Sequence, residues 1–213
     1  MSRLYLPKVV LAAVGSTKVK ETEQALAYSF NQIQFHSVLF FTNKENHTDH
    51  SSIKYKEIPE IKTLRDYQFF SVNKLPQYAL PELSDGVTHV LFISWDGFVV
   101  NPKAWDKQFL NYDYIGAPLP NSKTGGNGGF CLKSKKFLNQ QTNICDDSSL
   151  PCGLNEDIIL SISLRDQFIK AGCKYAPYSV AKNFAVEYDK YKASFGFHDL
   201  DIHPQFKPHV KLS

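Results

Sequence analysis

The sequence has few cysteines and no long hydrophobic run. Four cysteines occur in 213 residues, without a C-x-x-C pair, and we expect reduced thiols in a cytoplasmic protein. A zinc site built from these cysteines and distant histidines stays open as an alternative. No apolar run approaches the roughly 20 residues that a membrane span needs. The run at residues 9–14 loosely resembles a signal peptide, but it is short and follows Pro7, so a first buried strand explains it better.

An excess of one charge is also lacking. The 24 basic and 21 acidic residues are interleaved and leave a formal net charge of +3. No basic stripe of the kind that follows a phosphate backbone exists, so nucleic acid is not an expected partner. The glycines near the N-terminus do not form G-x-G-x-x-G, which disfavours an NAD-dependent enzyme.

Hydrophobic residues make up 43% of the chain and aromatic residues 14%, which indicates a well-filled core. Nothing resembles a linker or a low-complexity segment, so we expect one domain over residues 1–213. Apolar runs at 8–14 and 35–41, with helical spacing between 18 and 31, predict a β-α-β unit in which Ser16 or Thr17 caps the helix. Such a unit indicates an α/β fold with a parallel sheet.

The rest of the chain continues to alternate between strand-like and helical patterns. We expect strands over 53–58, 89–93, 112–118, 130–132 and 174–177, helices over 64–75, 158–171 and 180–184, and a helical turn over 105–110. Pro76 is expected to end the helix that starts at Leu64.

The strand predicted over residues 89–93 is the central one, and it runs into Asp96-Gly97. Ligands of open α/β sheets bind beyond the carboxyl ends of the strands, so Asp96 is a candidate site residue. The alternative is an ordinary Asp-Gly turn.

Three later segments also carry candidate site residues. Gly126-Asn127-Gly128-Gly129 has more backbone freedom than a structural turn requires, which indicates the close approach of a ligand rather than an ordinary flexible loop. Glu156 and Asp157 precede a helix, where acidic residues also suit the helix dipole. His198 is either a core imidazole or a ligand that reaches the same site late in the chain.

These segments together resemble a known family. The blocks that carry the resemblance are Ser94-Trp95-Asp96-Gly97-Phe98, Tyr112-Asp113-Tyr114-Ile115-Gly116-Ala117-Pro118, Gly126-Asn127-Gly128-Gly129-Phe130, Asn155-Glu156-Asp157 and Phe195-Gly196-Phe197-His198. Over residues 8–198 the chain resembles small glycosyltransferase domains with the GT-A fold, which occur in bacterial polysaccharide gene clusters and in large viruses of green algae. The resemblance implies a mixed, mostly parallel central sheet flanked by helices. It also implies a nucleotide-binding half at about 1–100 and a half for donor sugar and acceptor at about 101–213.

The resemblance also implies a metal site and a catalytic base. A GT-A enzyme usually holds a divalent cation through an Asp-x-Asp motif, and the cation bridges the two phosphates of a nucleotide-sugar. Ser94-Trp95-Asp96 stands at that place and keeps only the last carboxylate. The implied ligands of Mn²⁺ or Mg²⁺ are Asp96 and His198, since oxygen ligands suit both ions and imidazole suits Mn²⁺. Asp157 matches the base of the Glu-Asp pairs in inverting GT-A enzymes.

The remaining implied contacts are with the donor. The residues concerned are Val14, Gly15, Ser16 and Thr17 around the nucleoside, Thr42 and Asn43 near the base, Arg65 at the phosphates, Ser94 and Trp95 at the motif, and Gly126, Asn127 and Gly128 along the sugar. Trp95 or Trp105 could stack on a sugar face or belong to the core.

The function that follows is transfer of a hexose or deoxyhexose from a UDP-sugar to a hydroxyl of a glycan or glycoprotein, with inversion. The compartment expected is the cytoplasm, that of the host if the chain is viral. A non-catalytic domain that binds a nucleotide-sugar or glycan, within a larger polypeptide, is the main alternative. A nucleotidyltransferase or phosphohydrolase would normally show a second carboxylate next to Asp96 to hold two metals.

Overall fold

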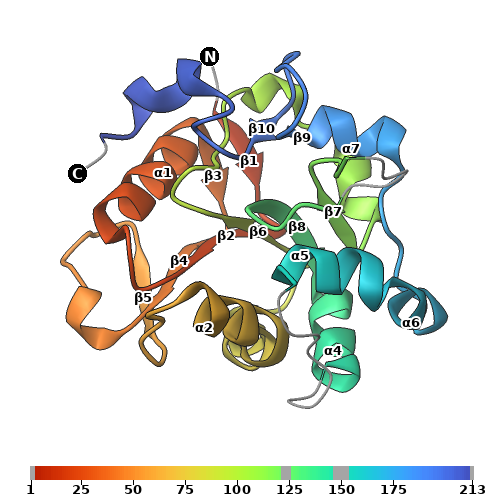
Figure 1. The fold of residues 1–213 in the computed structure, drawn as a ribbon. Helices are drawn as coiled ribbons and strands as arrows, with labels where there is room; N and C mark the ends of the chain where they lie inside the picture. Colours follow the sequence, from red (N-terminus) through yellow and green to blue (C-terminus); the bar gives the residue numbers. More distant parts are fainter. Residues whose placement is uncertain (1–2, 121–125, 146–153, 212–213) are drawn as a thin grey trace.

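A computed structural model describes residues 3–120, 126–145 and 154–211 of the chain (Figure 1). The strands are β1 (Leu4–Leu6), β2 (Val9–Val14), β3 (Ile33–Phe35), β4 (Val38–Thr42), β5 (Lys54–Glu57), β6 (His89–Ile93), β7 (Tyr114–Gly116), β8 (Phe130–Ser134), β9 (Ala185–Val186) and β10 (Gly196–Phe197). The α-helices are α1 (Val19–Gln32), α2 (Leu64–Phe69), α3 (Leu75–Ala79), α4 (Lys135–Ile144), α5 (Glu156–Ile158), α6 (Arg165–Lys170) and α7 (Tyr178–Phe184). Two π-helical turns, Phe70–Lys74 and Ile159–Ser163, continue α2 and α5. Short 3₁₀ turns cover Lys44–Asn46, Leu80–Glu82, Pro102–Ala104, Lys107–Asn111 and Pro204–His209.

Six strands form one mixed sheet in the order β5-β4-β2-β6-β8-β7. The first four run parallel to one another, and β8 runs antiparallel to both β6 and β7. This arrangement confirms the expected α/β fold with a mixed, mostly parallel sheet. Every residue of β6 is buried, as the continuous apolar run at 89–93 predicts for a central strand covered on both faces.

Helices cover both faces of this sheet (Figure 1). One core contains residues of α1 and α7 together with the β9–β10 pair. The other core lies between the sheet and the helices α2, α3, α4 and α6. The apolar sides of α1, α3, α4, α6 and α7 are therefore buried against the sheet, which is the usual solution for a doubly covered α/β sheet. Within the described ranges, none of the helices combines the length and the apolar character that crossing a bilayer requires.

The expected β-α-β opening is present, with two differences. The strand predicted over 35–41 is divided, since β3 ends at Phe35 and pairs with β1 outside the main sheet, while β4 begins at Val38. The predicted side-chain cap of α1 is wrong. Lys18 precedes the helix in a left-handed conformation (φ 52°) without a side-chain cap, and the Ser16 hydroxyl instead accepts a hydrogen bond from the Ile61 N–H at 2.9 Å.

The prediction that Pro76 ends the helix from Leu64 is also wrong. Pro76 lies in the first turn of α3, where a proline needs no N–H donor, and the helical path continues through Leu80–Glu82. The strand expected over 174–177 amounts to a single bridge between Tyr114 and Tyr175. Cys131 and Cys173 are buried free thiols, as expected, and Cys152 lies outside the described residues.

The topology brings three chain segments to one edge of the sheet. β2 and β6 end side by side, with Ala13 opposite Ile93. Because β8 is antiparallel to β6, its first residue, Phe130, lies opposite Ile93 at the same edge. The residues after β2, after β6 and before β8 are therefore neighbours in space. This edge is where ligands of α/β sheets bind.

Candidate active site

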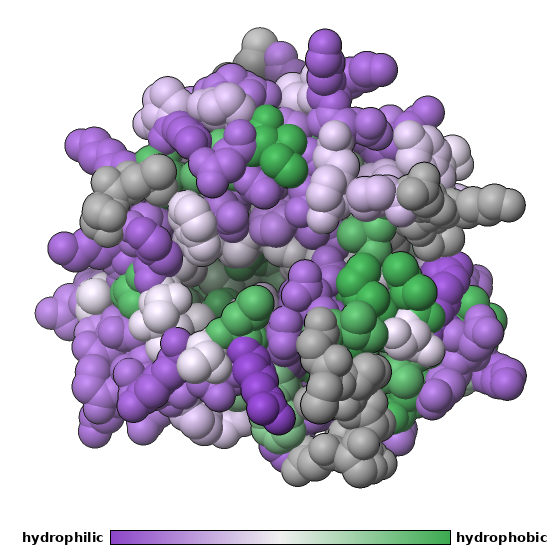
Figure 2. Space-filling model, in the orientation of Figure 1, coloured by the Kyte–Doolittle hydropathy of each residue, from purple (hydrophilic) through white to green (hydrophobic). Residues whose placement is uncertain are grey.

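A cavity of about 480 Å³ opens at this edge of the sheet. Figure 2 shows it as a hollow near the middle of the face seen in Figure 1. Its size lies within the range of small-molecule sites. The strand ends contribute Val14, Gly15, Ser16, Thr17, Ser94, Trp95, Asp96, Asn127 and Gly129 to its lining. Helices and later segments contribute Thr22, Ile61, Lys62, Thr63, Leu64, Tyr67, Asn155, Glu156, Asp157, Glu187, Tyr188 and His198.

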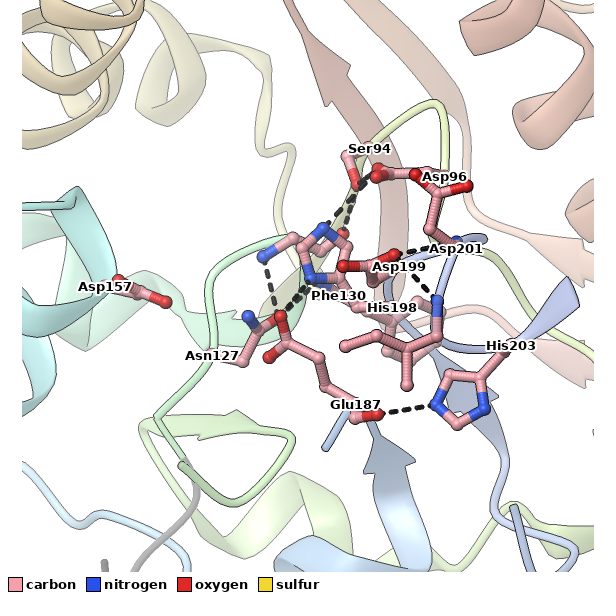
Figure 3. A network of polar contacts seen from close by, with 12 residues as sticks. Ser94, Asp96, Asn127, Phe130, Asp157, Glu187, His198, Asp199, Asp201 and His203 are labelled. Carbon is pink, nitrogen blue, oxygen red and sulfur yellow. Dashed lines mark hydrogen bonds and ion pairs between the residues drawn. The ribbon is translucent and has the colours of Figure 1, made fainter. Parts of the chain in front are cut away.

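Asp96 and His198, 102 positions apart in the sequence, are brought together in this cavity (Figure 3). The Nε2 atom of His198 lies 3.4 Å from Oδ1 of Asp96. The hydroxyl of Ser94 donates to Asp96 Oδ1 at 2.7 Å. Burial by itself would raise the pKa of Asp96, but the hydrogen bonds and charge of His198 and the hydroxyl of Ser94 lower it, so Asp96 is a carboxylate.

The second nitrogen of His198 faces another carboxylate. Its Nδ1 lies 3.1 Å from Oε1 of Glu187. Burial alone would lower the pKa of His198, but the hydrogen bonds to Asp96 and Glu187 outweigh it and raise the pKa to about 10. In this state the ring is an imidazolium whose Nδ1 donates to Glu187 and whose Nε2 forms an ion pair with Asp96. Binding of a cation at Nε2 would displace that proton, since metal ligands bind in their deprotonated forms.

Asp96 and His198 are the side chains of this cavity that best suit a divalent cation. No group of three or more His, Cys, Asp or Glu side chains with metal-site geometry occurs in the part of the chain that the structure describes. Asp96 and His198 form a pair, and neighbouring ligands in an octahedral site with bonds of about 2.1 Å are about 3 Å apart. The observed 3.4 Å is compatible with two ligands of one ion. The pair fits a cation that takes its other ligands from substrate and water.

The charge of the lining also favours a bound cation. Four carboxylic residues line the cavity, namely Asp96, Glu156, Asp157 and Glu187. Lys62 and His198 are the basic residues among the described lining. A diphosphate placed close to these carboxylates would be repelled by them, and a cation between the two would relieve that repulsion.

Asp157, on α5, faces the cavity from the side opposite β10 (Figure 3). It is 8% exposed, and its Oδ1 accepts a hydrogen bond from the Ile158 N–H at 2.7 Å. Burial raises the pKa of Asp157, and the nearby charge of Glu187 adds to this effect. Its neighbour Glu156 also lines the cavity, and burial together with the charge of Asp157 raises the pKa of Glu156 to about 7. Both carboxyls are therefore better proton acceptors than exposed ones.

The glycine-rich segment makes room for protein side chains. A Cβ at Gly128 would lie 2.6 Å from Glu156 Oε1, and one at Gly129 would collide with Nε2 of His198. The side chain of Asn127 fixes the turn, since its Oδ1 accepts from the N–H groups of Gly129 and Phe130 at 2.9 and 3.3 Å. Asn127 and Gly129 line the cavity, while Gly128 lies beneath it and Gly126 packs against Ser161.

Not all residues that the resemblance implied reach this cavity. Thr42 and Asn43 bond to Asn46 and Glu45, and Asn46 in turn donates to the Ser16 carbonyl, so they support the first turn from behind. Arg65 borders a separate cavity beside Asp66 and Phe69. Of the two tryptophans, Trp95 lines the main cavity, whereas Trp105 packs edge-on against Phe109 and Phe195 in the core.

The structure adds lining residues that sequence reasoning missed. Glu187 and Tyr188 follow β9. Tyr67 lies on α2, about one turn after Leu64, which is exposed. No motif marks Glu187, because its position depends on the pairing of β9 with β10. The two π-helical turns that continue α2 and α5 were a second missed feature, and such turns are frequent at functional sites.

The sheet order, with a cavity at the ends of β2 and β6, is that of a mixed α/β fold with its site at the carboxyl ends of the parallel strands. A structure titled "crystal structure of a glycosyltransferase involved in the glycosylation of the major capsid of PBCV-1" superposes with a TM-score of 0.50 at 12% identity. The match covers 89% of this chain and 93% of that chain, and it confirms the expected fold. The chain belongs to the family described as protein of unknown function (DUF5672), which matches residues 51–198 and so spans all four carboxylic residues of the cavity. No curated protein matches the chain.

Proposed function

We propose that the protein is a glycosyltransferase that moves a hexose or deoxyhexose from a UDP-sugar to a hydroxyl of a glycan or glycoprotein, with the help of Mn²⁺ or Mg²⁺. The observation that carries this proposal is the convergence of Asp96, His198 and Asp157 on one cavity from three separate elements. The similarity in fold to a glycosyltransferase supports the class of reaction. The sugar, the acceptor and the stereochemistry are part of the proposal.

In this proposal the donor lies along the strand ends. The turn at residues 14–17 faces the nucleoside, and Asn127 hydrogen-bonds the sugar. Asp96 and His198 hold a divalent cation, whose chemistry is to stabilise the negative charge on the departing nucleoside diphosphate. Trp95 is one of the aromatic side chains of the lining, and we propose that it stacks on a sugar face.

Asp157 is the proposed general base. An acceptor oxygen forms a bond to the anomeric carbon while the bond from that carbon to the phosphate oxygen breaks, and the electron pair leaves with the nucleoside diphosphate. The acceptor proton passes to Asp157, whose raised pKa suits this role. Attack from the face opposite the leaving group inverts the anomeric centre.

A nucleotide-sugar or glycan-binding domain without turnover is the second candidate. The observation that favours it is Ser94, which replaces the first carboxylate of the metal motif and leaves a pair of protein ligands. Product analysis separates the two functions. A transferase releases nucleoside diphosphate in step with acceptor glycosylation, a binding domain releases none, and a hydrolase releases it without acceptor.

The test is an assay of UDP released from a panel of UDP-sugars with Mn²⁺, with and without a mixture of simple glycosides as acceptors. We expect release that depends on one UDP-sugar and increases with acceptor. Binding of a UDP-sugar without release would contradict the transferase and support the binding domain.

A further inference from the structure

The side chains of Asp96, His198 and Glu187 form a chain of contacts in the cavity. Glu187, at one end of it, has no role in the function proposed above. Glu187 Oε1 lies 3.1 Å from His198 Nδ1, and His198 Nε2 lies 3.4 Å from Asp96 Oδ1 (Figure 3). Glu187 is 5% exposed. Among the described residues its second oxygen, Oε2, is buried without a hydrogen-bond partner. A buried carboxylate is costly unless a positive group compensates it, and the ring of His198 is its hydrogen-bonded partner.

The main chain holds Glu187 in place independently of its side chain. β9, which ends at Val186, pairs with β10, which ends at Phe197. The backbone N–H of His198 donates to the Val186 carbonyl at 2.9 Å. The ring of His203 lies 2.7 Å from the Glu187 carbonyl oxygen, as Figure 3 shows. Changing the Glu187 side chain therefore leaves these backbone bonds available.

Two glycines confine the imidazole ring from other sides. A Cβ at Gly97 would lie 3.2 Å from Cδ2 of His198, and one at Gly129 would meet Nε2. The ring can lie this close to both turns only because neither position carries a side chain. The orientation of His198 is thus set by contacts on its faces, and the hydrogen bond from Nδ1 sets which nitrogen points to Asp96.

We propose that Glu187 is the positioning residue of the cation site. By accepting the hydrogen bond from Nδ1–H of His198, it presents Nε2 toward Asp96, so that both atoms act as ligands of one divalent ion. Histidine ligands commonly donate their other N–H to a carboxylate, which fixes the tautomer and increases the basicity of the ligating nitrogen. This inference rests on the proposed function, because the ion is the one that would accompany the nucleotide-sugar.

The test is titration of the protein with Mn²⁺ in the presence of UDP. Binding is measured as the loss of the electron paramagnetic resonance signal of free Mn²⁺. Loss of such a carboxylate partner typically weakens metal binding about 10–100-fold, and this is the expected effect of Glu187→Gln. Asp189→Asn is the matched control, since Asp189 is an exposed carboxylate two positions away that lies outside the cavity lining. Wild-type Mn²⁺ affinity in Glu187→Gln would overturn the proposal.

A structural role alone is separated from a positioning role by a double-mutant cycle. If Glu187 acts through His198, Glu187→Gln added to His198→Ala weakens Mn²⁺ binding no further than His198→Ala alone. Fully additive losses would overturn the proposal. Should Glu187→Gln not fold, Glu187→Asp keeps the charge and shortens its reach by one carbon. It is expected to weaken Mn²⁺ binding by a smaller factor, and unchanged affinity there would also contradict the proposal.

The outcome for the wild-type protein separates this inference from the transferase itself. If wild-type protein binds no Mn²⁺ but releases UDP from a donor in the presence of EDTA, the positioning role is wrong and the transferase stands. If it neither binds Mn²⁺ nor releases UDP under any condition, both are wrong.

Discussion

Asp157, the proposed general base, has an adjacent carboxyl group in Glu156. Both line the cavity, and burial raises the pKa of each. Asp157 lies on a short helix whose first turn also contains Glu156, so the two side chains leave the backbone in different directions. The two carboxyls therefore face the cavity in different directions, although burial raises the pKa of both.

The first prediction compares conservative changes at these two positions. Asp157→Asn keeps the shape but removes the base, so we expect turnover to fall about 10²–10⁴-fold, as is typical for a lost general base. Nucleotide binding should stay close to that of the wild-type protein. Glu156→Gln serves as the matched control and should retain more activity. Equal or greater loss in Glu156→Gln, with Asp157→Asn active, would transfer the role of base to Glu156.

The second prediction concerns the pH dependence of stability. The folded-state pKa of Glu156 is about 7 against an ordinary value of 4.5. Between these two pH values the folded state binds more protons at this carboxyl group than the unfolded state does. The contribution of Glu156 to the free energy of unfolding is therefore full at low pH and is lost as the pH rises toward 7. Glu156→Gln removes this dependence. In thermal unfolding, the variant should gain on the wild-type protein from pH 5 to pH 7.5, and a constant difference between the two would refute the pKa assignment.

At the scale of elements, the glycine-rich turn before β8 determines how closely the neighbouring walls approach. Gly128 faces Glu156, and Gly129 faces His198. The sequence predicted that a ligand approaches this turn closely. In the structure the side chains of Glu156 and His198 approach it instead, and both line the cavity.

The third prediction is that Gly129→Ala displaces the ring of His198. The added methyl group would collide with Nε2, and overpacking of this kind costs about 1–3 kcal/mol. We expect lower thermal stability and weaker Mn²⁺ binding than in the wild-type protein. Chemical denaturation in a His198→Ala background provides the control, because removal of the ring should relieve most of the destabilisation. An equal cost in both backgrounds would show that the clash lies elsewhere.

Elements with a strong local pattern could be predicted from the sequence. The apolar runs of β2, β6 and β8 and the helical spacing of α1 are local signals, and Asp96 was identified because it follows a buried strand. The π-helical turns, the division between β3 and β4, and Pro76 within a helix depend on packing across the sheet, which the local pattern does not contain.

The site shows the same division between local and distant signals. Arg65 was expected at the phosphates, but Leu64 and Tyr67, three positions apart, share the α2 face toward the cavity and leave Arg65 on another face. Glu187 could not have been predicted, because it reaches His198 only through the two-residue strand β9 and its pairing with β10.

For the molecule as a whole, charge is distributed unevenly in a way that the formal net charge of +3 conceals. Four carboxylic residues line the main cavity, although the chain as a whole has more basic than acidic residues. In the proposed function, a positive ion completes this lining when a nucleoside diphosphate binds.

Calorimetric titration of the protein with UDP-sugars, with Mn²⁺ and with EDTA, in parallel for Asp96→Ala, decides whether a cation completes the site. We predict that one UDP-sugar binds with Mn²⁺, that EDTA abolishes this binding, and that Asp96→Ala weakens it by more than about 10-fold, as loss of a carboxylate ligand should. Equal binding of the UDP-sugar in EDTA, or full affinity in Asp96→Ala, would contradict a cation-completed site. Absence of binding to every UDP-sugar would contradict the proposed donor.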